Sequence, residues 1–260
     1  MPRSVGYTVR FAAGVSIVAS VLVAGSAVLL RDRQDANRLL DRRRKVLEVA
    51  GLVDAGERLT GDVVTRRFEA DIRTIVIELA TGEPAPEIDP VGFDQRAASR
   101  DPVRSRPAPE NSAGVTRLPD HAVVYHVIRQ SDIEALLVPI EGKGLWGTMY
   151  GYLALSSDLE TVRGITFYEH RETPGLGSGI EDSDWQVGWV GRRPFDDEWK
   201  PRLEVIKGPA GPPDAAPYEI DGLSGATLTG RGVTNLIRFW LGPDGFGAYL
   251  ERYRGEAGIP

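Results

Sequence analysis

The chain has 260 residues, a formal net charge of −6 at pH 7 and no cysteine. This length allows one substantial domain with accessory segments, and the acidic balance argues against a nucleic-acid partner. Without cysteine there are no disulfides or thiolate metal sites, and three widely spaced histidines do not suggest a metal centre, so any redox chemistry has to come from an organic cofactor.

The first predicted element is a transmembrane helix at residues 11–30, after a short N-terminal segment at residues 1–10. The run contains no charged residue, and twenty helical residues span about 30 Å, the thickness of a bilayer hydrocarbon core. The alternative is a cleaved signal peptide, because Arg3 and Arg10 make a basic start. The apolar core of a signal peptide has only about 7–15 residues, which favours a retained anchor.

A juxtamembrane amphipathic helix is predicted next, at residues 31–52, ending near Gly51. Two arginines precede the membrane span, whereas seven arginines or lysines follow it between residues 31 and 45. By the positive-inside rule, this distribution would keep the C-terminal part of the chain in the cytoplasm.

Residues 53–119 are predicted to hold a short helix at residues 62–72, a strand at residues 74–79 and then a proline-rich excursion. Residues 82–119 contain seven prolines and few large apolar side chains. Such a segment cannot bury enough apolar surface to offset its ordering entropy. It is therefore expected to form a surface excursion or a loop that wraps a partner.

Residues 120–260 are predicted to form an α+β domain, a twisted antiparallel sheet with flanking helices. Short β-branched or aromatic runs separated by Gly, Asp and Ser indicate an antiparallel meander of strands at residues 122–129, 134–139, 148–156 and 162–168. Residues 185–190 are a further candidate strand, and residues 202–207 are expected to form the last one. The closing helix is expected at residues 232–241, because Gly242-Pro243 follows it as a stop signal.

The segment before the closing helix has the composition of an anion-binding turn. It reads Asp221-Gly222-Leu223-Ser224-Gly225-Ala226-Thr227-Leu228-Thr229. Ser224 is a good helix N-cap, and the small Gly225-Ala226 pair lets a phosphate approach the N–H groups of a helix start. Taken alone, the segment fits an ordinary capping turn in which Thr227 packs inward.

This segment resembles the flavinylation motif of the FMN-binding domains in sodium-translocating NADH:quinone reductases and their relatives. Further blocks resemble the C subunit of that family in the same order: Gly144-Leu145-Trp146-Gly147-Thr148-Met149-Tyr150-Gly151, Tyr168-Glu169-His170-Arg171-Glu172-Thr173-Pro174-Gly175-Leu176-Gly177, and Phe239-Trp240-Leu241-Gly242 with Gly245-Phe246-Gly247. The juxtamembrane residues also match, so the resemblance covers nearly the whole chain. Gly230 departs from it, since serine is expected there.

The resemblance implies FMN held covalently by a phosphoester on Thr227, attached by a separate magnesium-dependent flavin transferase that uses FAD. Around that residue it implies contacts to the cofactor from Ser224, Gly225 and Ala226. The block beside the flavin would contribute hydrogen bonds and an apolar edge from Thr173, Gly175, Leu176 and Gly177. Further candidates are Trp146, Thr148 and Lys207, although Trp146 also fits a core position and Lys207 a solvated one.

The resemblance also implies an electron-relay subunit of a bacterial inner-membrane complex that oxidises NADH, reduces ubiquinone and exports Na⁺. It implies one membrane span with the FMN domain on the periplasmic side, against the charge distribution. Its partners would be the other subunits, the flavin transferase and membrane lipid. The sequence suggests no NADH site, catalytic side chain or metal site of its own. The alternatives are the flavin subunit of the related ion-translocating ferredoxin:NAD oxidoreductase complex and, in a different class, a cofactor-free membrane-anchored scaffold module.

Overall fold

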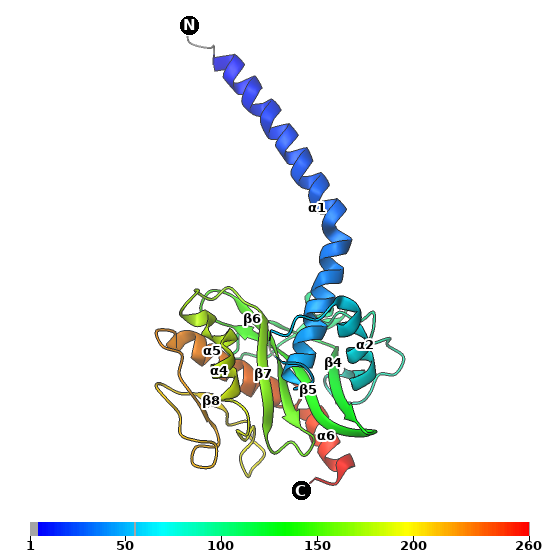
Figure 1. The fold of residues 1–260 in the computed structure, drawn as a ribbon, viewed down its shortest axis with the longest axis vertical. Helices are drawn as coiled ribbons and strands as arrows, with labels where there is room; N and C mark the ends of the chain where they lie inside the picture. The colour runs from blue at the N-terminus through cyan, green and yellow to red at the C-terminus, as the bar shows by residue number, and fades with distance from the viewer. Residues whose placement is uncertain (1–4, 55, 260) are drawn as a thin grey trace. The chain divides into compact units, whose positions relative to one another are not determined.

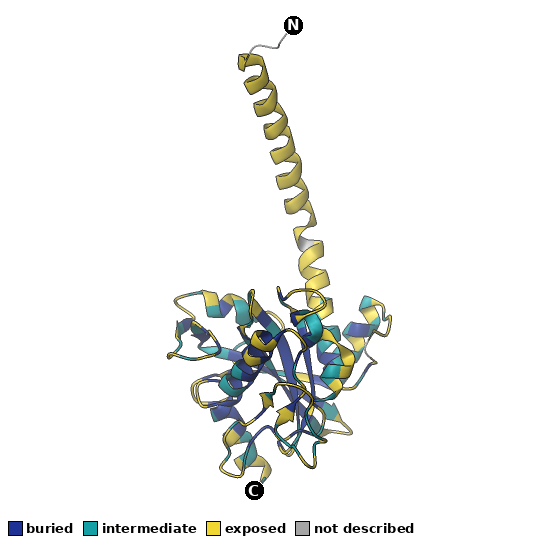
Figure 2. Cartoon of the chain, turned by 90° about the vertical axis from the view of Figure 1, so that its left-hand side faces the viewer, coloured by how far each residue is buried: buried dark blue, intermediate teal, exposed yellow. Residues whose placement is uncertain are grey.

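The computed structural model describes residues 5–54 and 56–259, and the chain divides into two units between Arg42 and Arg43. Residues 1–4 of the predicted N-terminal segment lie outside the described residues. The N-terminal unit consists of the first part of helix α1, Val5–Val49 (Figure 1). Its stretch Val5–Arg31 is long and apolar enough to cross a membrane. Figure 2 shows that the described residues of this stretch are exposed.

The two helices predicted at residues 11–30 and 31–52 are one continuous helix. Neither glycine nor proline occurs between Gly25 and Gly51, so no residue interrupts the helix where the apolar run ends. α1 ends at Val49, and Gly51 follows it with a φ of 70°, the left-handed conformation that glycine adopts after helices.

The second unit is built on a five-stranded antiparallel sheet in the order β1-β4-β5-β6-β7. The strands are β1 Ile72–Glu78, β4 His121–Arg129, β5 Asp132–Lys143, β6 Thr148–Ser156 and β7 Val162–Glu169. Strands β4 to β7 form the meander expected from the sequence, and β1 pairs with β4 at its edge. The predicted fold class is confirmed: one N-terminal apolar helix, then an α+β domain with an antiparallel sheet.

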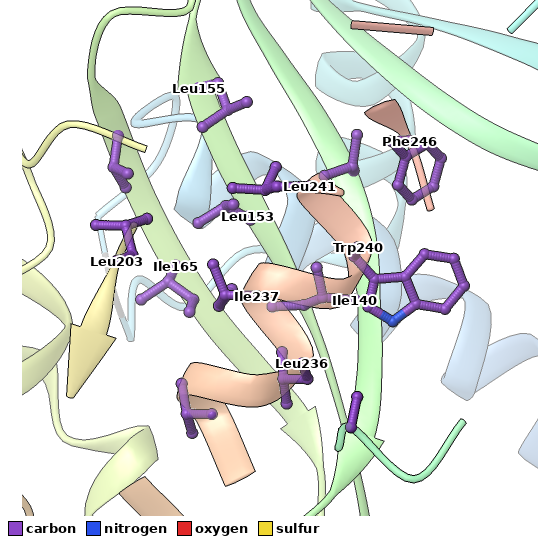
Figure 3. Close-up of a cluster of buried hydrophobic side chains, with 14 of the residues drawn as sticks. Ile140, Leu153, Leu155, Ile165, Leu203, Leu236, Ile237, Trp240, Leu241 and Phe246 are labelled. Atoms are coloured by element: carbon purple, nitrogen blue, oxygen red, sulfur yellow. The ribbon is translucent and has the colours of Figure 1, made fainter. Parts of the chain in front are cut away.

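One face of this sheet is covered by α5, Thr227–Leu241 (Figure 3). Apolar side chains from alternate strand positions meet the helix there, and the contact layer includes Ile140, Leu153, Ile165, Leu236, Ile237 and Trp240. Trp240 is fully buried and donates its indole N–H to the carbonyl O of Glu141 at 2.6 Å. Because this packing fixes the axis of α5, it also fixes where the helix begins.

The opposite face is covered by the last turns of α1 and by α2, Gly61–Asp71. Leu47 of α1 is fully buried. α1 lies close to β7, since a Cβ added at Gly164 would be only 3.0 Å from the carbonyl O of Val49. On the same face Phe68 of α2 meets Tyr125 edge to face, with ring centroids 6.0 Å apart.

The proline-rich residues 82–119 are folded onto the sheet, which corrects the prediction of a surface excursion. They contain α3, Gln95–Arg100, and a two-stranded sheet of β2, Ser105–Pro107, and β3, Arg117–Pro119. Arg96 of α3 lies 3.6 Å from the centroid of the Tyr150 ring and donates two hydrogen bonds to Glu169. Such polar contacts to the sheet order the segment, and a count of its apolar residues does not detect them.

The region before α5 also differs from its prediction. The strand expected at residues 185–190 is replaced by α4, Ser183–Val187, and the turn that follows it. The carboxylate of Asp182 caps α4 by accepting from the N–H of Asp184, and η1, Gly177–Glu181, precedes it. The strand expected at residues 202–207 is reduced to β8, Glu204–Val205, paired in parallel with β9, Glu219–Ile220. A last helix, α6, Gly247–Ala257, was not expected.

Candidate functional site

The segment 221–229 forms a turn that leads directly into the first turn of α5. The helix begins at Thr227 with Ala226 as its N-cap residue, and no side chain caps it. The prediction that Ser224 is the N-cap is therefore wrong. A turn closed by the hydrogen bond from Ala226 N–H to Leu223 O, with Gly225 at a φ of 70°, places Ser224 two residues too early. The N–H groups at this helix end consequently remain available to an outside acceptor.

Gly225 brings this turn against the loop of residues 173–177. A Cβ at Gly225 would lie 2.8 Å from Cδ2 of Leu176, and its positive φ is strained for other residues. Both residues are exposed, so the contact forms part of the surface. Two blocks that are about fifty residues apart in the sequence thus meet beside Thr227.

A groove of about 820 Å³ opens on the other side of this turn. It lies between β8 with the loop that follows it and the first three turns of α5, and its lining includes Lys207, Ser224, Thr227, Arg231 and Arg238. Arg238 is paired with Glu204 at 2.8 Å. Lys207 and Arg231 are exposed and take part in none of the ion pairs found among the described residues. Asp221 also lines the groove, so three basic and two acidic residues leave it a small excess of positive charge beside Thr227.

The two threonines of the first turn of α5 differ in their surroundings. Thr227 is exposed at the rim of the groove. Thr229 is 0 % exposed, and its hydroxyl donates a hydrogen bond to the carboxylate of Glu172. Of these two hydroxyls, only that of Thr227 is accessible to a reaction partner.

Exposed apolar side chains occur on the loops 144–147 and 173–177 and in the first turn of α5. They are Leu145, Trp146, Leu176 and Leu228, which range from 44 % to 65 % exposed. The alternative that Trp146 belongs to the core is excluded by its exposure. The backbone N–H of Trp146 donates to Oε1 of Glu172 at 3.0 Å, so the loop 144–147 is joined to the residue that directly precedes the loop 173–177.

Two predicted contact residues do not fit the role expected of them. The amide of Gly175, a predicted hydrogen-bond donor to the cofactor, already donates to Oγ of Ser178 at 3.0 Å. Thr148 lines a different pocket, of about 330 Å³, together with Arg96 and Glu141. In that pocket burial raises the pKa of the Glu141 carboxyl, and the nearby Arg96 opposes the increase. Thr148 is therefore placed away from the groove at Thr227.

Glu172 is the member of this site that the sequence prediction missed. It is 5 % exposed and links the loop of Trp146 to the first turn of α5. It stands within the recognised block 168–177, but an acidic residue in a glycine-rich loop is normally expected in solvent. The signal of this burial in the sequence is a pair of glycines, Gly144 and Gly177, which leave room for the carboxylate.

The site as a whole fits a phosphate ester that carries a flat apolar group. An accessible hydroxyl, uncapped helix N–H groups and two exposed cations suit the phosphate. The glycine at position 225 keeps the approach to the backbone open, and Leu176 offers an apolar ledge beside it. None of the hydrogen bonds found among the described residues reaches the Thr227 hydroxyl as a general base would.

Comparison with known proteins places this geometry in context. A family model of the FMN-binding domain matches residues 144–242. Over 254 residues the chain is 43 % identical to the C subunit of the Na(+)-translocating NADH-quinone reductase of Pseudomonas aeruginosa, covering 96 % of this chain and 97 % of that protein. It is 42 % identical to the protein of the same name from Yersinia pestis over 255 residues, covering 96 % and 94 %. The solved structure of Shewanella oneidensis NqrC matches with a TM-score of 0.77 at 31 % identity, covering 86 % of this chain and 99 % of that one.

Proposed function

The chain belongs to the NqrC family, the C subunits of Na(+)-translocating NADH-quinone reductases, and we propose that it carries FMN covalently through a phosphoester on Thr227. Family membership makes it a flavoprotein subunit of an electron-transport complex with an FMN-binding domain and implies further subunits as partners. The observation that carries the proposal is the contrast between the exposed Thr227 hydroxyl and the buried, hydrogen-bonded one of Thr229.

The residues around Thr227 would hold the two ends of the cofactor differently. The phosphate would lie against the uncapped N–H groups of α5, with Lys207 and Arg231 neutralising its charge from the groove. The backbone of Ser224, Gly225 and Ala226 forms the turn beneath it. The isoalloxazine would contact the apolar ledge of Leu176 and Trp146, with the neighbouring Thr173 and Gly177 as hydrogen-bonding groups.

The bound FMN would supply one- and two-electron chemistry, and this chain would position it and exclude competing reactions. Attachment requires a partner, for which we propose a magnesium-dependent flavin transferase that uses FAD. The hydroxyl oxygen of Thr227 would form the new bond to phosphorus, AMP would leave, and the hydroxyl proton would pass to solvent. The exposure of Ser224, Gly225, Thr227 and Leu228 supports access by such an enzyme.

The intact mass of the mature chain tests this proposal. A covalent phosphoester is expected to add the mass of one FMN less one water, and the denatured band is expected to fluoresce under ultraviolet light. A chain of unmodified mass that releases its flavin on denaturation would show that the cofactor is held without a covalent bond. A chain with no flavin at all would favour the scaffold alternative, which the FMN-binding domain match argues against.

In the complex, we propose that the subunit relays electrons during the transfer from NADH to ubiquinone that is coupled to Na⁺ export. The relatives, which match this chain over 94–97 % of their own length, are named as subunits of the quinone reductase. This favours the quinone reductase over the ferredoxin:NAD complex. No acidic residue occurs between residues 11 and 30, so the anchor itself is a poor candidate for an ion path.

We propose that α1 anchors the chain in the bacterial inner membrane among lipid and that the second unit lies in the periplasm. The seven basic residues after the span would instead predict a cytoplasmic location. Because the chain lacks cysteine, Asp214→Cys at an exposed position gives it a single thiol. A membrane-impermeant thiol reagent is expected to label this variant once the outer membrane is permeabilised. Labelling only after the inner membrane is opened would place the domain in the cytoplasm.

A further inference from the structure

We propose that Glu172 is a positioning residue whose buried carboxylate fixes Trp146 and the first turn of α5 and places a negative charge beside the flavin site. The part of this inference that concerns the flavin rests on the proposed function. The part that concerns Trp146 does not, because it describes contacts within the chain.

Three distant parts of the chain meet at this carboxylate. Oε1 accepts the backbone N–H of Trp146 at 3.0 Å, and Oε2 accepts the hydroxyl hydrogen of Thr229. The backbone N–H of Glu172 donates to Nδ1 of His170 at 3.1 Å, which fixes the loop from which the side chain extends. The same side chain therefore sets the position of loop 144–147 relative to α5.

Two glycines provide the space for the carboxylate. A Cβ at Gly144 would collide with Oε1, and one at Gly177 would lie 2.8 Å from Oε2 and 2.7 Å from Oγ1 of Thr229. Gly177 has an ordinary backbone conformation, since its φ is not among the positive values. Its lack of a side chain is therefore explained by the room that Glu172 and Thr229 need.

If Glu172 only held loop 144–147 against α5, its side chain would not need to be charged. Glu172 takes part in none of the ion pairs found among the described residues, so hydrogen bonds and the positive end of the α5 dipole are what stabilise it. A buried carboxylate without a cation costs free energy. A neutral amide of the same shape could still accept the N–H of Trp146, and it would donate to Oγ1 of Thr229 instead of accepting from it. The charge is thus better explained by an effect on a neighbouring group. A fixed negative charge opposes the addition of electrons, which would lower the reduction potential of a flavin on Thr227.

Two substitutions separate the positioning effect from the effect of charge. Glu172→Gln keeps an oxygen for the N–H of Trp146 and an amide to which the Thr229 hydroxyl can adapt, but it removes the charge. In the flavin-bearing full-length chain, its flavin potential is expected to become more positive, with covalent flavin retained. Glu172→Ala removes both acceptors. Hydrogen exchange of the Trp146 amide is then expected to accelerate about tenfold or more, from the loss of one charge-assisted hydrogen bond.

Glu181→Gln is the matched control, because Glu181 lies nearby, 3.1 Å from Nε2 of His170, with a side chain that is 55 % exposed. It should leave both the potential and the Trp146 amide unchanged. The proposal is overturned if Glu172→Gln keeps the wild-type potential, or if Glu172→Ala keeps the wild-type exchange rate. Should Glu172→Ala fail to fold, the potential of Glu172→Gln decides. Exchange is measured on chain made without the transferase, so a failure of the flavin proposal would leave this test intact.

Discussion

Thr227→Ala is expected to abolish covalent flavin attachment completely, leaving the chain at its unmodified mass without fluorescence on a denaturing gel. The substitution removes the oxygen that would form the phosphoester, and the next threonine, Thr229, is buried. Thr227 is exposed at the start of α5, so the free energy of unfolding should change by no more than about 0.5 kcal/mol. The loss of covalent flavin would therefore result from the missing hydroxyl and not from misfolding.

Thr116→Ala is a suitable control, since it removes an exposed threonine hydroxyl that does not line the groove. Thr229→Ala is not a suitable control, because the Thr229 hydroxyl donates to Glu172 and its loss would disturb the site. Fluorescence that persists in Thr227→Ala would show that the flavin is attached elsewhere. The residue that carries it would then be found by mass spectrometry of proteolytic peptides.

Acidification from about pH 7 to about pH 4 is expected to lower the free energy of unfolding by about 3 kcal/mol through His126. His126 of β4 is 8 % exposed, and its Nε2 lies 2.6 Å from the hydroxyl oxygen of Tyr249 of α6. Burial, with a smaller effect of Arg73, lowers the pKa of His126 from 6.5 to about 4. Between these two values the unfolded chain binds a proton that the folded chain does not. Stability therefore falls as the pH falls through this window and levels off below it.

His126→Gln should remove this decrease of about 3 kcal/mol in the free energy of unfolding between pH 7 and pH 4. The measurement is urea unfolding of the full chain in detergent at several pH values between 4 and 7. Tyr249→Phe should lower stability at every pH but keep the slope, because burial is the main cause of the lowered pKa. A His126→Gln chain with an unchanged slope would assign the acid sensitivity to other groups.

The fold was predictable where local pattern and final structure agree. The meander from β4 to β7 follows from short β-branched runs, and the end of α5 follows from its apolar spacing and its Gly242-Pro243 stop. The start of α5 was not predicted correctly, because the helix begins at Thr227 and not at residue 232. The prediction failed at residues 185–190, because two tryptophans and two valines favour a strand by composition. Asp182 as a helix cap outweighs that preference.

The candidate site was predictable in its motifs but not in its connections. The turn at Thr227 and the ledge at Leu176 were expected to lie together, and the structure brings them into contact through Gly225. The burial of Glu172 depends on donors at positions 146 and 229, which only the folded sheet brings near it. Similarly, the ordering of residues 82–119 depends on Arg96 reaching Tyr150 and Glu169. Long-range polar contacts of this kind leave no periodic pattern in a sequence.

The burial of the last turns of α1 determines where a water-soluble version of the second unit should begin. Composition alone would suggest a cut after residue 52, where the charged helical stretch was predicted to end. Such a truncation would remove Val46 and Leu47, which are at most 1 % exposed, and uncover the strand surface around Gly164. The lost burial of a leucine alone amounts to about 1.5–3 kcal/mol. An expression fragment that keeps the domain intact should therefore start no later than Arg43.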